Sequence, residues 1–470
     1  MSQPNIVTYI AGARGRIKRD THVESAYRVP LTELGAPELE AHRAALTLKP
    51  RDLGYSDRPP ACIACYELTA THLVVPRFYG VREFGPASTV AVSAGEPLTA
   101  PFAGTLNSLQ RESVDRALAR MVGEGPRGTM LVLPCGYGKT VCGLAIAAAL
   151  GRRTLCLVHK AFLVSQWQER VAQFLPTASF GKIQQNTVDG TSDIVIGMIQ
   201  SLAARDYSDE LLRRFGTIIV DEAHHMSAPV FSQALRKLPA KHIIALSATP
   251  DRPDGLTPML HWSMGEICQR VQRKAEATRV TCAVYSGQRV ERTYRNGKIA
   301  LPLMLNDMAL DGQRNQLIAD RIALYVSGGR TVIVLTDRLA QLQALYALLT
   351  AGSLVAEDIA FYVGSTRASD REHATKRAVI LSTYSMAKEG LDIPRLDTLV
   401  LATPKGDVEQ AIGRIQRRCD GKQVPLVCDV CDDFSFFAHL NKKRLRFYRL
   451  QKFETQSLSL QDAAATAWYR

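Results

Sequence analysis

The sequence predicts an α/β fold with two doubly wound parallel-sheet domains in tandem and a small N-terminal accessory domain. From about residue 105 onward, short apolar runs alternate with helical patterns, which is typical of parallel sheets covered by helices. The alternation occurs in two sets, and the first strand of the first set leads into a glycine-rich loop. With 470 residues, the chain is long enough for three domains that each bury a core.

The expected strands are short apolar runs, each followed by a polar switch and a helical pattern. A helix over 105–121 precedes strands at 130–133, 154–158, 193–197, 217–220 and 242–246 in the first set. The second set comprises 331–335, 359–363, 378–381, 398–401 and 425–428. The predicted boundaries are an accessory domain over 1–99, α/β domains over 100–278 and 302–470, and a hairpin or linker over 279–301.

Two segments are expected to form β-structure outside these sheets. Residues 66–84 are apolar and aromatic enough to pair as strands. Residues 279–301 carry β-branched residues on both sides of Asn296-Gly297, which is a strong hairpin turn signal. The cations Arg289, Arg292, Arg295 and Lys298 surround that turn, so the hairpin is predicted to touch a polyanion, with a merely solvated basic turn as the alternative.

The segment 129–140, T-M-L-V-L-P-C-G-Y-G-K-T, reads as a buried strand that runs into a phosphate-binding loop. Gly136 and Gly138 let backbone N–H groups turn around an anion, Lys139 would reach the β- and γ-phosphates, and the Thr140 hydroxyl would bind Mg²⁺. The other members of this predicted nucleotide site are Pro134, Cys135 and Tyr137. Leu133 stands where the full phosphate-loop pattern has its first glycine, and a tight turn with an exposed lysine is the alternative.

Acidic residues follow the strand 217–220, at the carboxyl end where open parallel sheets bind ligands. In this D-E-A-H sequence, Asp221 would hold Mg²⁺ through water and Glu222 would polarise the water that attacks the γ-phosphate. Ser247 and Thr249 close the next strand, and their hydroxyls would sense the γ-phosphate side of the site. A solvated acidic turn is the alternative.

The segment 407–418 has a helical pattern in which Gln410, Arg414 and Arg417 share one face and apolar residues the other. A packed helix of this kind would point both arginines outward together. Beside a bound triphosphate they could serve as arginine fingers, a role worth ~10³ to 10⁵ in rate. A solvated basic face is the alternative.

Together these segments resemble the superfamily 2 helicases. The matching stretches are 134–140 (motif I), 158–167 (V-H-K-A-F-L-V-S-Q-W, motif Ia), 221–224 (motif II), 247–249 (motif III), 332–338 (motif IV), 382–392 (S-T-Y-S-M-A-K-E-G-L-D, motif V) and 410–417 (Q-A-I-G-R-I-Q-R, motif VI). The S-Q-W ending of motif Ia and the E-G-L-D form of motif V look closest to the XPB-like branch of DEAH-type enzymes.

The resemblance implies RecA-like domains, ATP with Mg²⁺ as cofactors, and further site residues. Gly390 and Asp392 would complete the ATP site, and Gln410 would lie near His224 to couple the two domains. Gln110 stands where family members read adenine, without the arginine that usually precedes it. The expected nucleic-acid contacts are His159, Gln166, Thr336 and Thr383, with Arg295 and Lys298 added from the hairpin. No counterpart of the branch's R-E-D element is evident, so the resemblance implies ATP hydrolysis more strongly than strand separation.

The balance of charges favours a nucleic acid as partner. Lys and Arg number 58 against 45 Asp and Glu, a net charge of +13. The resemblance implies a 3′-to-5′ motor on duplex or forked DNA in transcription or repair, with an RNA helicase and a non-enzymatic nucleic-acid scaffold as alternatives. Segment 434–452 adds six cations and no acidic residue, so we expect a helix with its basic side chains facing the duplex or simply solvated.

Compartment and metal content follow from two further features of the sequence. No apolar run approaches the ~20 residues that span a bilayer, and no secretory h-region is evident, so an intracellular location is expected. Zinc binding at the C-x-x-C pairs Cys62/Cys65 and Cys428/Cys431 is disfavoured, because the pairs are far apart and no histidine lies near either. The cysteines are expected to be reduced core thiols.

Overall fold

The computed structural model forms two compact units, to which the described residues up to 271 and from 277 onward belong, respectively. The structure describes residues 19–51, 60–134, 136–223, 228–248, 251–252, 254–271, 277–287, 290–364, 366, 368–389, 393–417 and 419–461. The predicted site residues Cys135, His224, Thr249, Gly390 and Asp392 lie outside these ranges, as does Arg289 of the predicted hairpin.

The first unit is built on an eight-stranded sheet whose order is β11-β10-β12-β9-β13-β14-β8-β15. All neighbours in it run parallel except the β10–β11 pair. The strands are β8 (Arg127–Val132), β9 (Thr154–Val158), β10 (Phe180–Gln184), β11 (Thr187–Val188), β12 (Ile194–Met198), β13 (Thr217–Asp221), β14 (His242–Ser247) and β15 (Glu266–Arg270). The register pairs Asp221 with Leu246 and Ser247 with Val132, so β8, β13 and β14 end at one edge of the sheet.

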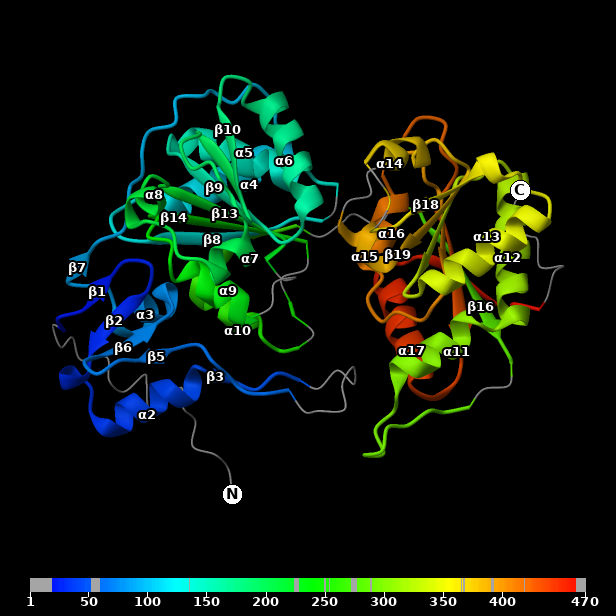
Figure 1. The fold of residues 1–470 in the computed structure, drawn as a ribbon, viewed down its shortest axis with the longest axis horizontal. Coiled ribbons are helices and arrows are strands. Elements are labelled where there is room, and N and C mark those ends of the chain that lie inside the picture. The colour runs from blue at the N-terminus through cyan, green and yellow to red at the C-terminus, as the bar shows by residue number, and fades with distance from the viewer. Residues whose placement is uncertain are drawn as a thin grey trace. The chain divides into compact units, whose positions relative to one another are not determined.

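Helices cover both faces of this sheet (Figure 1). One face packs against α4 (Ser108–Met121), α5 (Lys139–Leu150) and α6 (Ala161–Phe174). The other packs against α7 (Ile199–Ala204), α9 (Ala228–Leu235) and α10 (Thr257–Met264), while α8 (Asp209–Arg213) precedes β13. Alternate residues of the buried strands therefore enter two separate cores, as a doubly wound sheet requires.

The N-terminal segment of the first unit forms a five-stranded sheet of order β5-β6-β2-β1-β7 that shares a core with one face of the eight-stranded sheet. Its elements are β1 (His22–Val23), β2 (Tyr27–Pro30), α2 (Ala36–Ala45), β5 (Glu67–Leu68), β6 (His72–Val75), α3 (Arg77–Phe84) and β7 (Thr89–Val90), with a separate pair β3 (Thr47–Leu48) and β4 (Ile63–Ala64). Arg77 is buried, and its guanidinium donates to the carbonyls of Leu238 and Ala240.

The expectation that 66–84 pairs as strands is wrong for its second half. Residues Arg77–Phe84 form helix α3 instead, which begins directly after Pro76. Its face buries Arg77 and Tyr79 against the first unit, and Gly80 lies so close to the Tyr27 ring that a Cβ would fall 2.2 Å from the ring's Cγ. Tertiary packing thus overrides the strand preference of the aromatic residues.

The second unit is a seven-stranded parallel sheet of order β18-β19-β17-β20-β21-β16-β22. Its strands are β16 (Arg279–Tyr285), β17 (Val332–Thr336), β18 (Ile359–Tyr362), β19 (Val379–Thr383), β20 (Thr398–Leu401), β21 (Leu426–Asp432) and β22 (Glu454–Ser459). Helices α12 (Gly312–Ser327) and α13 (Leu339–Ala351) cover one face, and α15 (Tyr384–Glu389), α16 (Glu409–Ile415) and α17 (Ser435–Leu450) cover the other (Figure 1). The remaining helices are α11 (Leu301–Ala309) and α14 (Ala368–Ala374).

The hairpin expected over 279–301 is wrong in its first arm. Residues Arg279–Tyr285 form β16, which lies inside the second sheet and pairs in parallel with both β21 and β22. Buried apolar side chains on both faces of β16 explain why this strand joins a covered parallel sheet. In the described residues 290–301, a short turn remains of the hairpin, where an isolated bridge joins Thr293 to Ile299 and Gly297 has a φ of +78°.

None of the helices among the described residues is long and apolar enough to cross a bilayer.

Candidate functional site

The loop between β8 and α5 has the backbone of an anion cradle. Gly136 and Gly138 have φ values of +85° and +81°, a region that L side chains rarely adopt. A Cβ at Gly138 would also lie 2.4 Å from Nε2 of Gln110. Helix α5 begins immediately after this glycine, so its first N–H groups face the loop. The strand-to-helix arrangement inferred for the phosphate site is therefore present.

Gln110 braces this loop. Together with Asn107 it forms a capping box at the start of α4, in which the Asn107 N–H donates to Gln110 Oε1 at 3.1 Å. The Gln110 Nε2 donates to the Tyr137 carbonyl of the loop at 3.3 Å. Both ends of the carboxamide are thus engaged with the protein, so reading adenine would require the side chain to release these bonds.

Lys139 and Glu222 form an ion pair of 2.9 Å between Nζ and Oε1. Both side chains are mostly buried, with 10% and 16% exposure. Glu222 has a φ of +47°, an uncommon value for a residue with a Cβ. The residue directly after β13 is therefore strained, and its carboxylate contacts the lysine that is predicted to bind phosphate.

Asp221 lies beside this pair as the last residue of β13 and is 6% exposed. Burial and the neighbouring Glu222 carboxylate raise the pKa of Asp221 to about 6, against the opposing effects of Lys139 and of a hydrogen bond from Trp167. The indole Nε1 of Trp167 donates to Asp221 Oδ2 at 2.9 Å. The S-Q-W sequence contained this residue, but no pattern in the sequence linked it to Asp221.

The remaining predicted site residues of the first unit lie at or after the ends of neighbouring strands. Ser247 is buried, and its carbonyl accepts a hydrogen bond of 2.9 Å from the N–H of Leu133, directly before the phosphate loop. His159 follows β9 and is half-buried, and its carbonyl accepts from Gln200 Nε2 at 2.9 Å. Gln166 lies on α6 and is also half-buried.

The donor set fits a triphosphate with a divalent cation. The cradle supplies N–H groups, Lys139 a cation, and Thr140 and Asp221 the hard oxygen atoms that Mg²⁺ prefers. The positive φ values of both glycines leave the backbone open toward the ligand, as phosphate loops require.

Comparison with known proteins identifies the family. Residues 103–252 match the family model described as type III restriction enzyme, res subunit. A putative ATP-dependent RNA helicase of Acanthamoeba polyphaga mimivirus is 31% identical over 408 residues, which cover 85% of this chain and 78% of that protein. The chain belongs to the superfamily 2 helicases. It is an ATP-hydrolysing enzyme.

Other relatives agree with this assignment. A probable helicase of Escherichia phage T5 is 26% identical, covering 71% of the helicase described here and 74% of the phage protein. The S. cerevisiae protein Dbp5, solved with RNA and ADP BeF3, superposes with a TM-score of 0.53 at 15% identity over 75% of this chain and 90% of its own. That likeness supports the fold of two RecA-like domains.

In the second unit of the helicase, the predicted arginine face differs from the structure. Helix α16 ends at Ile415, so Arg417 lies beyond it and does not continue the face of Gln410 and Arg414. Gln410 and Arg414 are buried, and Arg414 Nε donates to the Ala387 carbonyl at 2.9 Å. The expectation that both arginines point outward from one helix face is wrong, because the packed helix is shorter than its sequence pattern.

The predicted nucleic-acid contacts divide into accessible and inaccessible residues. Thr336 is fully buried and its hydroxyl donates to Gln341 Oε1 at 2.6 Å, so the prediction that its side chain meets nucleic acid is wrong. Thr383 is half-buried at the end of β19, with its hydroxyl 3.1 Å from that of Ser385. Arg295 is exposed and Lys298 half-buried at the turn of residues 293–299.

Helix α17 confirms the expected C-terminal helix but not all of its basic face. Arg444 is only 1% exposed, and its Nε donates to Asp429 Oδ2 at 2.8 Å. The other five cations are exposed, namely Lys442, Lys443, Arg446, Arg449 and Lys452. The expectation that all six face a duplex is therefore wrong for Arg444, which holds α17 to β21.

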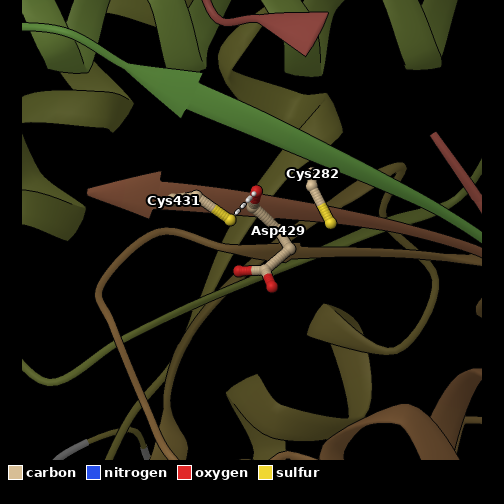
Figure 2. Close-up of side chains that lie close together, drawn as sticks. All are labelled: Cys282, Asp429 and Cys431. Atoms are coloured by element: carbon tan, nitrogen blue, oxygen red, sulfur yellow. Dashed lines mark hydrogen bonds between the residues drawn. The ribbon is translucent and has the colours of Figure 1, made fainter. Parts of the chain in front are cut away.

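Among the residues that the structure describes, one cluster of three His, Cys, Asp or Glu side chains lies close enough to share a metal ion, namely Cys282 of β16 with Asp429 and Cys431 of β21 (Figure 2). Arg444 and the Tyr448 hydroxyl both donate to Asp429 Oδ2 at 2.8 Å, so the carboxylate is already neutralised. The Cys282 thiol and burial raise the pKa of Cys431 far above its usual range, which disfavours the thiolate that a metal needs. We interpret this group as a polar network within the core.

Proposed function

We propose that this helicase is an ATP-driven motor that moves 3′-to-5′ on duplex or forked DNA, as a member of the XPB-like branch. The observation that carries the motor is the meeting of Lys139, Glu222 and Asp221 at one sheet edge, with Asp221 hydrogen-bonded to Trp167, the last residue of motif Ia. The choice of DNA is supported by the forms of motifs Ia and V and by the net charge of +13.

The proposed mechanism starts from the Lys139–Glu222 ion pair. An incoming triphosphate competes with Glu222 for the Lys139 ammonium, so binding releases the Glu222 carboxylate. Glu222 then orients the attacking water and accepts its proton. Thr140 and Asp221 would hold Mg²⁺, which would neutralise charge on the phosphates. Arg417 of the second unit would stabilise the transferring phosphoryl group.

An RNA helicase is the second candidate, because the mimivirus relative and one from African swine fever virus carry the name putative ATP-dependent RNA helicase. The ATPase rate measured with duplex DNA, forked DNA, single-stranded DNA and RNA at equal nucleotide concentration separates the two. Stimulation by duplex or forked DNA at least tenfold above that by RNA is expected; the reverse order would replace DNA by RNA in the proposal.

The basic turn of residues 293–299 provides a prediction about nucleic-acid contact. Reversing Arg295 and Lys298 to Glu is expected to weaken DNA binding about tenfold, because each cation that meets a phosphate is replaced by a repelling charge. The melting temperature should stay within about 2 °C, since substitutions of solvent-facing residues seldom alter stability strongly. Unchanged affinity in a DNA titration would show that this turn is solvated and does not contact DNA.

Helix α17 provides a prediction about salt dependence. Changing the four exposed cations of α17 and Lys452, which follows the helix, to Gln, with Arg444 retained, is expected to flatten the slope of log K against log salt by ~2 to 3 units if about three of them meet phosphates. The effect should be equal on unrelated DNA sequences, since phosphate contacts carry no base information. A slope equal to that of the parent helicase would show that the helix only packs.

The matched control for this experiment is Arg444→Gln alone. Because Arg444 and Asp429 are both 1% exposed, the change leaves a buried carboxylate without its cationic partner, at a cost of ~3 to 5 kcal/mol of unfolding free energy. Its expected signature is a lower melting temperature with an unchanged salt slope. The two variants thus separate packing from phosphate contact.

A further inference from the structure

The side chain of Trp167 joins elements of the helicase that belong to different motifs. It lies on α6, which begins two residues after His159 of the motif Ia loop. It is 1% exposed, and its indole N–H donates to Asp221 Oδ2 at the end of β13. The path from the predicted nucleic-acid-binding loop to a predicted ATP-site carboxylate therefore consists of one helix and one hydrogen bond.

The ring of Trp167 also packs on the helix that carries the phosphate loop. A Cβ placed on Gly143 of α5 would lie 3.6 Å from the ring's Cη2 atom. Trp167 belongs to the same buried cluster as Cys142 of α5 and Ile219 of β13. Because packed interiors transmit displacement, a movement of α6 at this point must be felt by both α5 and β13.

Core packing alone does not explain why the Trp167 indole donates its hydrogen bond to a carboxylate. A buried indole N–H needs an acceptor, and any backbone carbonyl would satisfy it. Here it meets a carboxylate that is 6% exposed and next in the chain to the strained Glu222. A hydrogen bond to a charged acceptor is stronger than a neutral one and fixes the rotation of the carboxylate. This arrangement suits a group whose orientation has to be maintained.

We propose that Trp167 is a positioning residue that holds Asp221 in its working orientation and links the motif Ia helix to the ATP site. Nucleic acid that binds at the motif Ia loop shifts α6, and the indole carries this shift to Asp221. The link to nucleic acid rests on the proposed function, whereas the hydrogen bond that orients Asp221 does not depend on the substrate.

The first test reads the hydrogen bond without any catalysis. The sequence contains three tryptophans, so a ¹⁵N-indole spectrum of the full chain should show three N–H signals, with that of Trp167 assigned by its loss in Trp167→Phe. The Asp221→Asn variant is expected to move the Trp167 signal and to speed its exchange with solvent, leaving the other two in place. An unmoved Trp167 signal would overturn the hold on Asp221.

The same spectrum tests the link to nucleic acid. Adding a DNA or RNA oligonucleotide without nucleotide is expected to shift the Trp167 signal in the parent chain. If DNA and RNA both bind but leave the signal unchanged, the coupling is wrong even where the hold on Asp221 is right. If RNA alone shifts it, the coupling stands and the DNA proposal fails, so the two failures are distinguishable.

Kinetics provide the second test. Replacing Trp167 by β-(3-benzothienyl)alanine keeps the ring shape and removes the donor, so it changes the hydrogen bond with little change in packing. We expect the nucleic-acid-stimulated kcat to fall by about tenfold to a hundredfold, as for the loss of a hydrogen bond to a charged group. The KM for nucleic acid should remain within about twofold.

The matched control is Phe174→Leu at the other end of α6, where Phe174 stacks on Phe102 with ring centroids 5.6 Å apart. This change disturbs the packing of the same helix away from Asp221. It is expected to lower the melting temperature and to leave kcat unchanged. Equal kcat in the benzothienyl variant and in this control would mean that Trp167 contributes packing only.

Discussion

Glu222→Gln is expected to lower the kcat for ATP by about 10²- to 10⁴-fold while ATP still binds. In the proposed mechanism Glu222 orients the attacking water and takes its proton, and general-base catalysis contributes a factor of that size in enzymes. Binding should become tighter, because the neutral amide no longer holds the Lys139 ammonium in the 2.9 Å ion pair that ATP has to displace. Turnover measured with saturating ATP and the Kd of a fluorescent ATP analogue test both parts.

Lys139→Ala is the counterpart of this variant. It removes the cation that the phosphates would bind, so both ATP affinity and turnover are expected to fall. The two residues of this ion pair are thus expected to have opposite effects on ATP affinity: Glu222→Gln raises it and Lys139→Ala lowers it. A turnover in Glu222→Gln within tenfold of the parent would mean that another group activates the water, and weaker ATP binding in that variant would contradict the competition.

Arg417→Ala is expected to leave ATP affinity within about threefold and to lower hydrolysis by roughly 10³-fold or more, as the loss of an arginine finger does. The structure separates this residue from Arg414. Arg414 is buried and donates to the Ala387 carbonyl, whereas Arg417 lies after the end of α16. We therefore assign the proposed arginine-finger role to Arg417 and not to Arg414.

The control for this variant is Arg446→Ala, which removes an exposed arginine of the same unit on α17. It should leave turnover unchanged at saturating nucleic acid. Full turnover in Arg417→Ala would contradict catalysis that requires both units, whereas a loss of ATP binding would show that Arg417 acts before the chemical step.

Buried strands could be predicted from the sequence because their signal is local. The run 154–158 has the same bounds in the structure, and the ends of β8, β13 and β14 carry the phosphate loop and the acidic motif as expected. Strand β16 was also visible as a run of β-branched residues. Its partners were not, since β21 and β22 lie more than a hundred residues farther along the chain.

Site residues were harder to judge where a tertiary partner decides their role. The local sequence does not distinguish Arg444 from the other five cations of 434–452. Arg444 is buried because it pairs with the carboxylate of Asp429 on β21. Thr336 comes at the end of an apolar run, as the residues at the ligand-binding edge of the first sheet do. In the structure, however, its hydroxyl is buried and donates a hydrogen bond to Gln341. Trp167 was likewise readable as an apolar helix residue, and its hydrogen bond to Asp221 depends on the meeting of α6 and β13.

The central claim is that ATP hydrolysis drives movement along nucleic acid, and displacement of a third strand from a DNA triplex measures such movement directly. With ATP, the parent helicase is expected to displace the third strand from duplex DNA, while Glu222→Gln binds the same DNA and displaces none. ATP-dependent displacement by the parent on DNA or RNA substrates supports a motor. Rapid DNA-stimulated hydrolysis without displacement on any of them would contradict it.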